Sequence, residues 1–261
     1  MATIILNGCQ VEAPEDMTVL QLARRKGIAI PTLCYHDALG AQGACRLCIV
    51  EMESPSRKRA VTTSCNLLVA EGMSIQTDTP HIRSLRKLLF ELLLGRSPAS
   101  KPLLEMAKQF GVDPPNYHAR SQSDCVQCGL CVRACQNAIG VSAITFSGRG
   151  QKRRVTTEYD RASDVCIGCG ACANLCPTGM IRLEDHGEER KILINKEGVI
   201  GTFKLVRCAS CNRPFATDKF LAHVAPRSDG KNSIAFDKGF CPACARKLAA
   251  KTSGELAVIL G

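Results

Sequence analysis

The 261-residue chain contains no tryptophan, and aromatic residues make up only 4% of it. It also lacks any run of about eighteen apolar residues, the length that predicts a membrane-spanning helix. The opening MATIILNGCQ has no basic segment followed by an apolar stretch, so we expect no secretion signal. With so little bulky apolar material, we expect several small modules rather than one large core.

Motifs for substrate chemistry are missing as well. The sequence has no GxGxxG dinucleotide fingerprint and no Walker-type phosphate loop. We therefore expect a chain that contributes no catalytic residues of its own.

Cysteine is the abundant residue, with seventeen copies that fall in close groups two or three residues apart. Disulfide frameworks spread their partners, whereas this spacing is typical of metal ligands. Free thiols predict a reducing compartment, most simply the cytoplasm. The formal charge of +10 falls to roughly +2 if sixteen thiolates hold four metal centres of about −2 each, so the basic residues mostly balance metal sites.

The first cysteine group has the spacing C-x10-C-x2-C, followed by a fourth cysteine in SCNLLVAEGM. Four thiolates suit a 2Fe-2S cluster, because each iron takes two, although the spacing alone also suits zinc. The ligands predicted for the 2Fe-2S cluster are Cys34, Cys45, Cys48 and Cys65.

The segments around this group predict an α+β module. Asn7-Gly8 marks a β-hairpin, residues 19–26 form a short helix ended by Gly27, and strands are expected at 48–52, 59–63 and 73–77. A helix over 80–94, closed by Gly95, and a second helix near 103–110 form a connector.

Residues 125–176 contain the pattern C-x2-C-x2-C-x3-C twice, as CVQCGLCVRAC and CIGCGACANLC. In the bacterial ferredoxin pattern the fourth cysteine of each run ligates the other 4Fe-4S cluster. Two zinc knuckles would want a histidine within each run, and neither run has one. The crossed assignment gives Cys125, Cys128, Cys131 and Cys176 to cluster one, and Cys135, Cys166, Cys169 and Cys172 to cluster two.

Two CxxC pairs lie near the carboxyl end, Cys208 with Cys211 and Cys241 with Cys244. A four-cysteine tetrahedral site favours structural zinc in a treble-clef-like module. Rubredoxin-like iron and a further iron-sulfur cluster are the alternatives. The remaining Cys9 is expected to be a buried structural thiol.

Residues 1–95, through the cysteine loop and VAEGMSIQTDTPHIRSLRKLLFELLL, resemble the plant-ferredoxin-type (β-grasp) domain of the large iron-sulfur subunit of complex I. Diaphorase-side subunits of NAD(P)-linked hydrogenases and formate dehydrogenases share this domain. The resemblance implies two partners, a flavin- and NAD(P)-binding diaphorase subunit and a hydrogenase or formate dehydrogenase catalytic subunit.

One feature of that family is missing. Its members often carry a further 4Fe-4S cluster held by one His and three Cys, but no cysteine lies between positions 66 and 124. His81 and His118 are therefore expected to be surface or helix residues. Electrons would pass directly from the 2Fe-2S domain to the twin clusters, or through another subunit.

The expected organisation is a 2Fe-2S domain (1–79), a helical connector (80–124), a twin 4Fe-4S domain (125–190) and a zinc module (191–261). The favoured function is electron transfer within an oxidoreductase complex, without catalysis by this chain and without nucleic acid or a membrane span. A self-contained hydrogenase would need a further large domain. A regulatory or nucleic-acid-binding protein could use the zinc module and the basic run at 151–154, but stacking aromatic residues are missing there.

Overall fold

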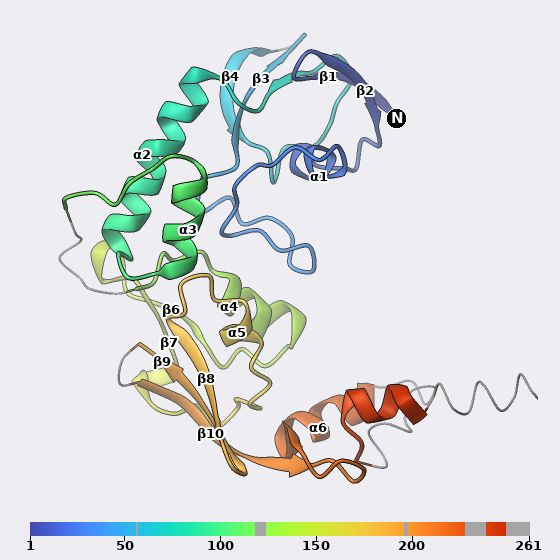
Figure 1. Cartoon of the computed structure of the whole chain (residues 1–261), viewed down its shortest axis with the longest axis vertical. Coiled ribbons are helices and arrows are strands. Elements are labelled where there is room, and N and C mark those ends of the chain that lie inside the picture. The colour runs from blue at the N-terminus through green and yellow to red at the C-terminus, as the bar shows by residue number, and fades with distance from the viewer. Residues whose placement is uncertain (56, 118–123, 196–197, 228–238, 249–261) are drawn as a thin grey trace, which may run out of the picture. The chain divides into compact units, whose positions relative to one another are not determined.

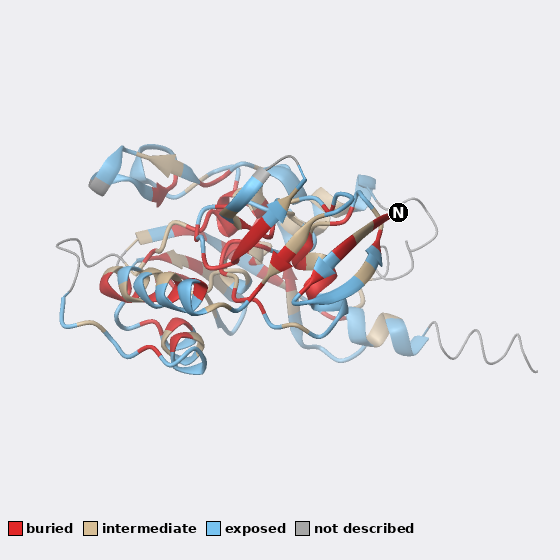
Figure 2. Cartoon of the chain, turned by 90° about the horizontal axis from the view of Figure 1, so that it is seen from above, coloured by how far each residue is buried: buried red, intermediate tan, exposed pale blue. Residues whose placement is uncertain are grey.

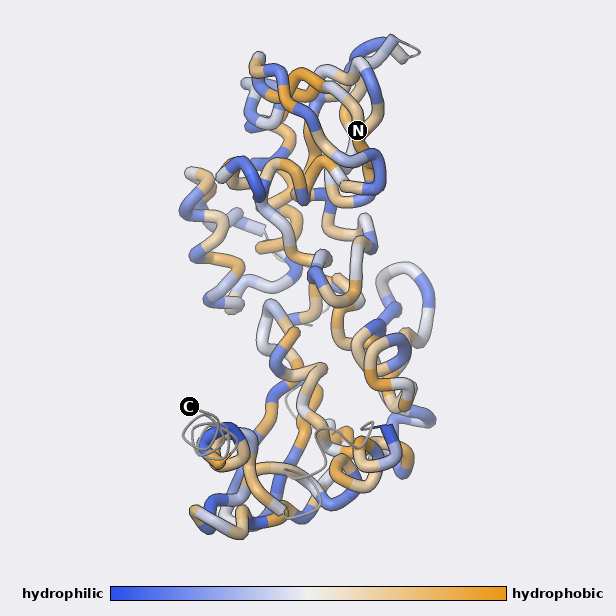
Figure 3. The backbone as a smooth tube through the Cα atoms, turned by 90° about the vertical axis from the view of Figure 1, so that its right-hand side faces the viewer, coloured by the Kyte–Doolittle hydropathy of each residue, from blue (hydrophilic) through white to orange (hydrophobic). Residues whose placement is uncertain are grey.

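The computed structural model describes residues 1–55, 57–117, 124–195, 198–227 and 239–248 (Figure 1). It divides into two compact units: the first contains residues 1–140, 146–155 and 175–180, and the second contains residues 141–145, 156–174 and 181–261. Within the described ranges no helix is long and apolar enough to cross a bilayer. Figure 3 shows polar residues interrupting the apolar stretches of the backbone.

The chain opens with the predicted β-hairpin. Strand β1 (Ala2–Leu6) pairs antiparallel with β2 (Cys9–Ala13). Asn7 and Gly8 both have positive φ, 51° and 84°, which gives the turn a twist that matches the strands. Cys9 is exposed, so the expectation of a buried thiol was wrong. It lies on an edge strand, directly after the turn and opposite Leu6.

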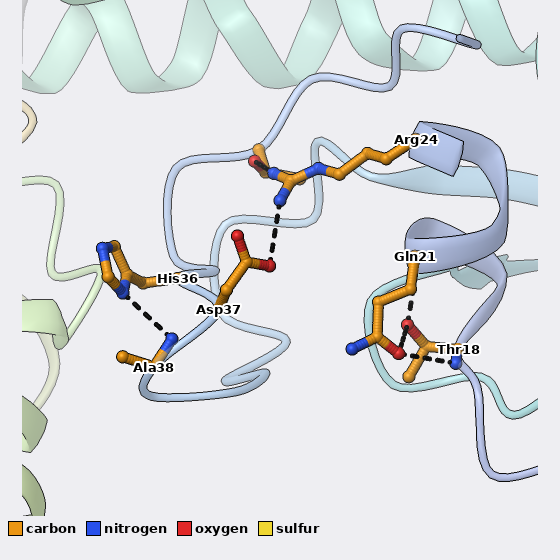
Figure 4. Close-up of polar contacts among 7 residues, drawn as sticks. Thr18, Gln21, Arg24, His36, Asp37 and Ala38 are labelled. Atoms are coloured by element: carbon orange, nitrogen blue, oxygen red, sulfur yellow. Dashed lines mark hydrogen bonds and ion pairs between the residues drawn. The ribbon is translucent and has the colours of Figure 1, made fainter. Parts of the chain in front are cut away.

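Five strands and one helix form the first module. Helix α1 (Val19–Arg25) is followed by β3 (Ile49–Ser54), β4 (Arg57–Thr63) and β5 (Ser74–Gln76), in the sheet order β2-β1-β5-β3-β4. Strands β1 and β5 are parallel, and the other pairs are antiparallel. A capping box begins α1: Thr18 Oγ1 accepts from the Gln21 amide at 3.3 Å, and Gln21 Oε1 accepts from the Thr18 amide at 2.9 Å (Figure 4).

The core of this module lies between α1 and the sheet. Val19 and Leu20 on the helix pack with Ile4, Val50 and Ile75 on the strands, and all five are almost fully buried. Figure 2, which colours buried residues red, shows the buried part of β1 beginning beside the N-terminus. Each fully buried side chain of this size contributes roughly 1.5–3 kcal/mol to folding.

Two helices follow, α2 (Pro80–Arg96) and α3 (Lys101–Gln109). The expectation that Gly95 ends the first helix was wrong, because α2 continues to Arg96. Gly95 serves close packing instead: a Cβ at this position would lie 2.8 Å from Cε2 of Tyr117. His81 is exposed on α2, as expected, and His118 lies outside the described residues.

The two cysteine runs each pass through one turn of helix. Helix α4 (Leu130–Arg133) continues into the π-helical turn η1 (Ala134–Ala138), and α5 (Ala171–Asn174) occupies the same place in the second run. Between them, β6 (Thr145–Ser147) and β7 (Arg154–Thr156) form a two-stranded sheet, with the 3₁₀ turn η2 (Gly150–Lys152) between the strands. A further turn, η3 (Glu158–Asp160), precedes the second run.

The second unit is organised around an antiparallel sheet of four strands. It consists of β8 (Ile181–His186), β9 (Glu189–Ile194), β10 (Gly198–Arg207) and β11 (Pro214–Thr217), in the order β11-β10-β9-β8. Strand β9 runs through residue 190, where the sequence suggested a domain boundary. Helix α6 (Asp218–Val224) and the turn η4 (Ala225–Arg227) follow, and residues 242–248 are helical.

Candidate metal centres

The first cysteine group is drawn together in the first unit. Cys34, Cys45, Cys48 and Cys65 are all buried, with 1–7% of their surface exposed. The Cys45 amide donates to the Cys34 sulfur at 3.4 Å. The loop between these two cysteines turns at Gly40 and Gly43, both with positive φ, which lets the backbone fold closely around the thiols.

The four thiols form two hydrogen-bonded pairs. A hydrogen bond from the Cys45 thiol lowers the pKa of Cys34 to about 5, with help from the amides of Cys45 and Ala44. A hydrogen bond with Cys65 lowers the pKa of Cys48 to about 7. The same bonds, followed by burial, raise the pKa of Cys45 and of Cys65. In each pair the bond thus lowers the pKa of one thiol and raises the pKa of the other.

This pairing fits the predicted cluster. A 2Fe-2S cluster takes two cysteines on each iron, and the pairs Cys34–Cys45 and Cys48–Cys65 supply two each. The backbone amides that already point at Cys34 are the groups that stabilise a thiolate ligand. When bound, such a cluster accepts and releases one electron at a time.

Helix α2 supports the cysteine loop from behind through Arg86, which is 3% exposed. Its Nε donates to the Leu47 carbonyl at 3.2 Å, and one terminal nitrogen donates to the Ile49 carbonyl at 2.7 Å. Both carbonyls flank Cys48. The side chain thus fixes the backbone on each side of a predicted ligand.

Next to the loop, the surface contains a group of polar side chains from α1 and from residues 35–38, which follow Cys34. Arg24 makes an ion pair with Asp37 at 3.3 Å (Figure 4). It also lies over the Tyr35 ring, 4.9 Å from its centre. The His36 Nδ1 accepts from the Ala38 amide at 3.2 Å. These contacts shape the exposed side of the loop and leave the thiols inside.

The first 4Fe-4S run also lies in the first unit. Cys125, Cys128 and Cys131 are buried, and the predicted fourth ligand Cys176 belongs to the same unit. Burial raises the pKa of Cys125. Burial, with smaller contributions from the negative charges of Cys176, Cys125 and Cys34, raises the pKa of Cys128 to about 12. The sulfurs are thus close enough to affect one another.

Backbone amides and small residues surround these sulfurs. The Gln127 amide donates to the Cys125 sulfur at 3.3 Å, and the Leu130 amide donates to Cys128. Gln127 and Gly129 both have positive φ, which turns the chain sharply between ligands. Amide donors around several sulfurs, with water kept away by burial, fit a 4Fe-4S cluster.

The second run is positioned by the sheet of the second unit. A Cβ on Gly168 would lie 2.7 Å from Phe203 Cγ and from Thr217 Cγ2, so the ligand loop packs directly on β10 and β11. Thr217 Oγ1 donates to the Ile167 carbonyl, and Arg190 donates to the Gly168 carbonyl at 3.3 Å. Cys166, Cys169 and Cys172 belong to this unit, whereas Cys135 belongs to the first, and its role stays a prediction.

The two carboxyl-terminal pairs meet in one site. The sulfurs of Cys208, Cys211, Cys241 and Cys244 all lie within 4.8 Å of one another, and those of Cys211 and Cys241 are 3.9 Å apart. The Cys241 amide donates to the Cys208 sulfur at 3.2 Å, and this bond is the main cause that lowers the pKa of Cys208 to about 6. A hydrogen bond with Ser210 lowers the pKa of Cys244, but the bonds with Cys241 and Cys211 outweigh it and raise that pKa to about 11.

Comparison with known families agrees with the cysteine groups. Residues 1–80 match a 2Fe-2S iron-sulfur cluster binding domain, and residues 124–180 and 165–216 match a 4Fe-4S dicluster domain. An NADH-quinone oxidoreductase subunit of Rickettsia prowazekii (strain Madrid E) is 30% identical over 210 residues, which cover 71% of this chain. The chain carries both kinds of iron-sulfur domain and is similar to an iron-sulfur subunit of complex I.

Other relatives point the same way. NADH dehydrogenase [ubiquinone] iron-sulfur protein 1, mitochondrial, of Solanum tuberosum is 29% identical over 202 residues, or 68% of the chain. The chain spans 30% and 27% of these two curated relatives. A crystal structure of an NAD+-reducing [NiFe]-hydrogenase has a TM-score of 0.57 and 27% identity, covering 68% of this chain and 85% of that one.

Sequence reasoning missed the arginines that hold the predicted ligand loops. Besides Arg86 and Arg190, Arg96 Nε donates to the Cys125 carbonyl at 2.6 Å, and Arg133 donates to the Cys34 carbonyl at 2.7 Å. The only signal in the sequence was the basic excess, which indicated compensation of metal sites without naming residues. Their positions gave no hint, because a basic residue on a helix or a strand usually faces water.

Proposed function

We propose that this chain is an electron-transfer subunit that carries electrons between a flavin module oxidising NAD(P)H and a second, catalytic subunit. The supporting relatives are named as subunits of NADH-quinone oxidoreductase and as part of an NAD+-reducing hydrogenase. The proposed partners are accordingly a flavin- and NAD(P)-binding diaphorase subunit and a hydrogenase or formate dehydrogenase subunit. The chain's free thiols fit the reducing cytoplasm as its location.

One observation carries the proposal: a single apolar core contains ligands of two predicted clusters. Cys34 and Cys45 pack with Leu33, Leu47 and Leu130, and Cys128 is part of the same group of buried residues. Side chains of α2 and α3, including Phe90 and Leu103, complete it. We name these residues the connector core.

The connector core favours a direct route from the 2Fe-2S cluster to cluster one. It joins the two ligand sets without the His-ligated cluster found in many relatives, and it needs no bridging subunit between them. Its apolar side chains exclude water from the space between the ligands, which limits the reorganisation that an electron transfer would require. The charge of Cys34 acts on the pKa of Cys128, as expected for neighbouring sulfurs.

The proposed ligand sets are those of the sequence analysis. The 2Fe-2S cluster would use the two thiol pairs, cluster one would use Cys125, Cys128, Cys131 and Cys176, and cluster two would use Cys135, Cys166, Cys169 and Cys172. Arg86, Arg96, Arg133 and Arg190 hold the backbone of these segments and bring positive charge near them.

We also propose a structural zinc ion at the carboxyl-terminal site. A tetrahedron with Zn–S bonds of about 2.3 Å has sulfurs about 3.8 Å apart. The Cys211–Cys241 separation of 3.9 Å supports a single ion, since a 4Fe-4S cluster holds its ligands farther apart. Cys208 and Cys211 lie between β10 and β11, and Cys241 directly precedes the helical residues 242–248, an arrangement that supports the treble-clef-like module.

The proposal is tested by purifying the full chain anaerobically with its native partners. We expect about ten irons per chain and one 2Fe-2S and two interacting 4Fe-4S signals by EPR. NADH or NADPH should reduce the clusters in the complex but not those in the isolated chain. Dithionite should reduce the clusters of the isolated chain. Fewer than about eight irons, or full reduction of the isolated chain by NADH, would contradict the proposal.

A further inference from the structure

Arg133 connects two ligand segments that are far apart in the sequence. It lies on α4, between Cys131 and Cys135 of the first 4Fe-4S run. One terminal nitrogen donates to the carbonyl of Cys34 at 2.7 Å. The other donates to the carbonyls of Leu39 and Gly40 at 2.9 and 3.2 Å.

The start of α4 also contacts the 2Fe-2S loop and the residues beside it. Leu130 packs in the connector core beside Leu33 and Leu47. A Cβ on Gly129 would lie 3.9 Å from Cδ of Gln42. Arg133 is therefore the polar part of a contact whose remaining members are apolar or small.

The charge of Arg133 has no carboxylate partner among the residues that the structure describes. Its Nε is buried and makes no hydrogen bond within those residues. All its described bonds go to backbone carbonyls, which orient the guanidinium and leave its charge in place.

We propose that Arg133 is a positioning residue for electron transfer, which fixes the Cys34–Gly40 arm against the first 4Fe-4S segment and favours reduction of the 2Fe-2S cluster. Reduction adds one electron, and hence one negative charge, while the arginine stays protonated. A fixed positive charge in a partly buried site stabilises the more negative state. The inference rests on the ligand sets of the proposed function.

The test uses the full chain with its clusters, titrated electrochemically and followed by EPR. At a fixed potential, Arg133→Gln should lower the ratio of reduced to oxidised 2Fe-2S cluster about tenfold, which equals about 59 mV for a one-electron couple. The magnetic interaction between the 2Fe-2S and 4Fe-4S clusters should weaken as well. Arg133→Lys keeps the charge but cannot make three bonds with the same geometry. It should therefore weaken the magnetic interaction, while the ratio of reduced to oxidised 2Fe-2S cluster stays close to that of the unaltered chain.

Arg25→Gln is the matched control, because it removes an exposed arginine from the same unit. It should leave the ratio and the interaction unchanged. An unchanged ratio and interaction in Arg133→Gln, or the same shift in Arg25→Gln, would overturn the inference. If Arg133→Gln does not retain the cluster, Arg133→Lys decides: a weakened interaction supports the inference and wild-type behaviour refutes it.

These readouts do not depend on the partner subunits. Chemical mediators set the potential, so the titration works even if NADH never reduces the complex. Failure of the proposed function would therefore appear in the NADH experiment alone, and failure of this inference in the titration alone.

Discussion

The guanidinium of Arg86 donates from Nε to the carbonyl of Leu47 at 3.2 Å, across 39 positions of sequence. Leu47 stands between two predicted 2Fe-2S ligands, and both it and Arg86 are almost fully buried. Helix α2, which follows β5, thus holds the cysteine loop that precedes β3.

Arg86→Met should weaken the 2Fe-2S module. The substitution removes the donors to the Leu47 and Ile49 carbonyls, and each buried group left without a partner costs about 1–3 kcal/mol. We expect a lower melting temperature and loss of visible 2Fe-2S absorption on mild heating, measured under anaerobic conditions. Arg83 lies on the same helix and makes an exposed ion pair with Asp78. Arg83→Met should change neither the melting temperature nor the 2Fe-2S absorption.

Gly168→Ala should damage the second 4Fe-4S site. The backbone there has a φ of 70°, and the added Cβ would overlap Phe203 and Thr217. The left-handed conformation costs about 1–2 kcal/mol for a residue with a Cβ, and the overlap adds to that cost. We expect iron content to fall toward about six per chain, as determined by iron analysis after anaerobic reconstitution.

Gly187→Ala separates the backbone strain from the overlap of the added Cβ with neighbouring side chains. Gly187 has a φ of 61° in the β8–β9 turn, and a Cβ there would have no neighbour within 4 Å. It should lower stability through backbone strain alone and keep the full iron content. Equal iron loss in both variants would show that packing on β10 and β11 does not matter for this site.

The crossed assignment of the 4Fe-4S ligands predicts different outcomes for two cysteines. Cys176→Ser should perturb cluster one, whose other ligands lie near it in the first unit, and Cys135→Ser should perturb cluster two. EPR of each variant, compared with Cys125→Ser and Cys166→Ser, identifies the affected cluster. The assignment fails if Cys176→Ser gives the spectrum of Cys166→Ser.

The carboxyl-terminal site should hold zinc independently of the iron. Cys241→Ser removes both a thiolate ligand and a well-formed site geometry, so we expect the chain to lose about one zinc per molecule and keep its iron. Elemental analysis of the purified protein measures both metals together. Cys9→Ser is the control, because Cys9 is exposed and belongs to none of the four predicted sites. Iron in place of zinc in the unaltered chain would contradict the zinc proposal.

Local features of the fold could be predicted because their causes are local. The Asn7-Gly8 turn, the short helix before Gly27 and the cysteine spacings each depend on a few neighbouring residues, and the structure contains the hairpin and the helix where they were expected. Cysteine spacing also indicated the 2Fe-2S and dicluster domains that the family comparison supports.

Features that depend on distant contacts could not be predicted in the same way. The role of Gly95 is set by Tyr117, and that of Arg133 by carbonyls 93 to 99 positions away. Strand β9 pairs with β8 along its whole length, although a domain boundary was expected at residue 190. Cys9 is exposed because its strand lies at the edge of the sheet.

The pairing of β1 with β5 has a consequence for how the protein is made. Asn7 bonds to Thr77, its Oδ1 accepting from the Thr77 amide at 2.8 Å, and Ile5 and Leu6 pair with residues 74 and 75. The sheet can therefore close only after residue 77 has left the ribosome, when all four cysteines of the first group have been synthesised. The predicted 2Fe-2S ligand set is thus complete in the sequence well before Cys125, the first cysteine of the 4Fe-4S runs.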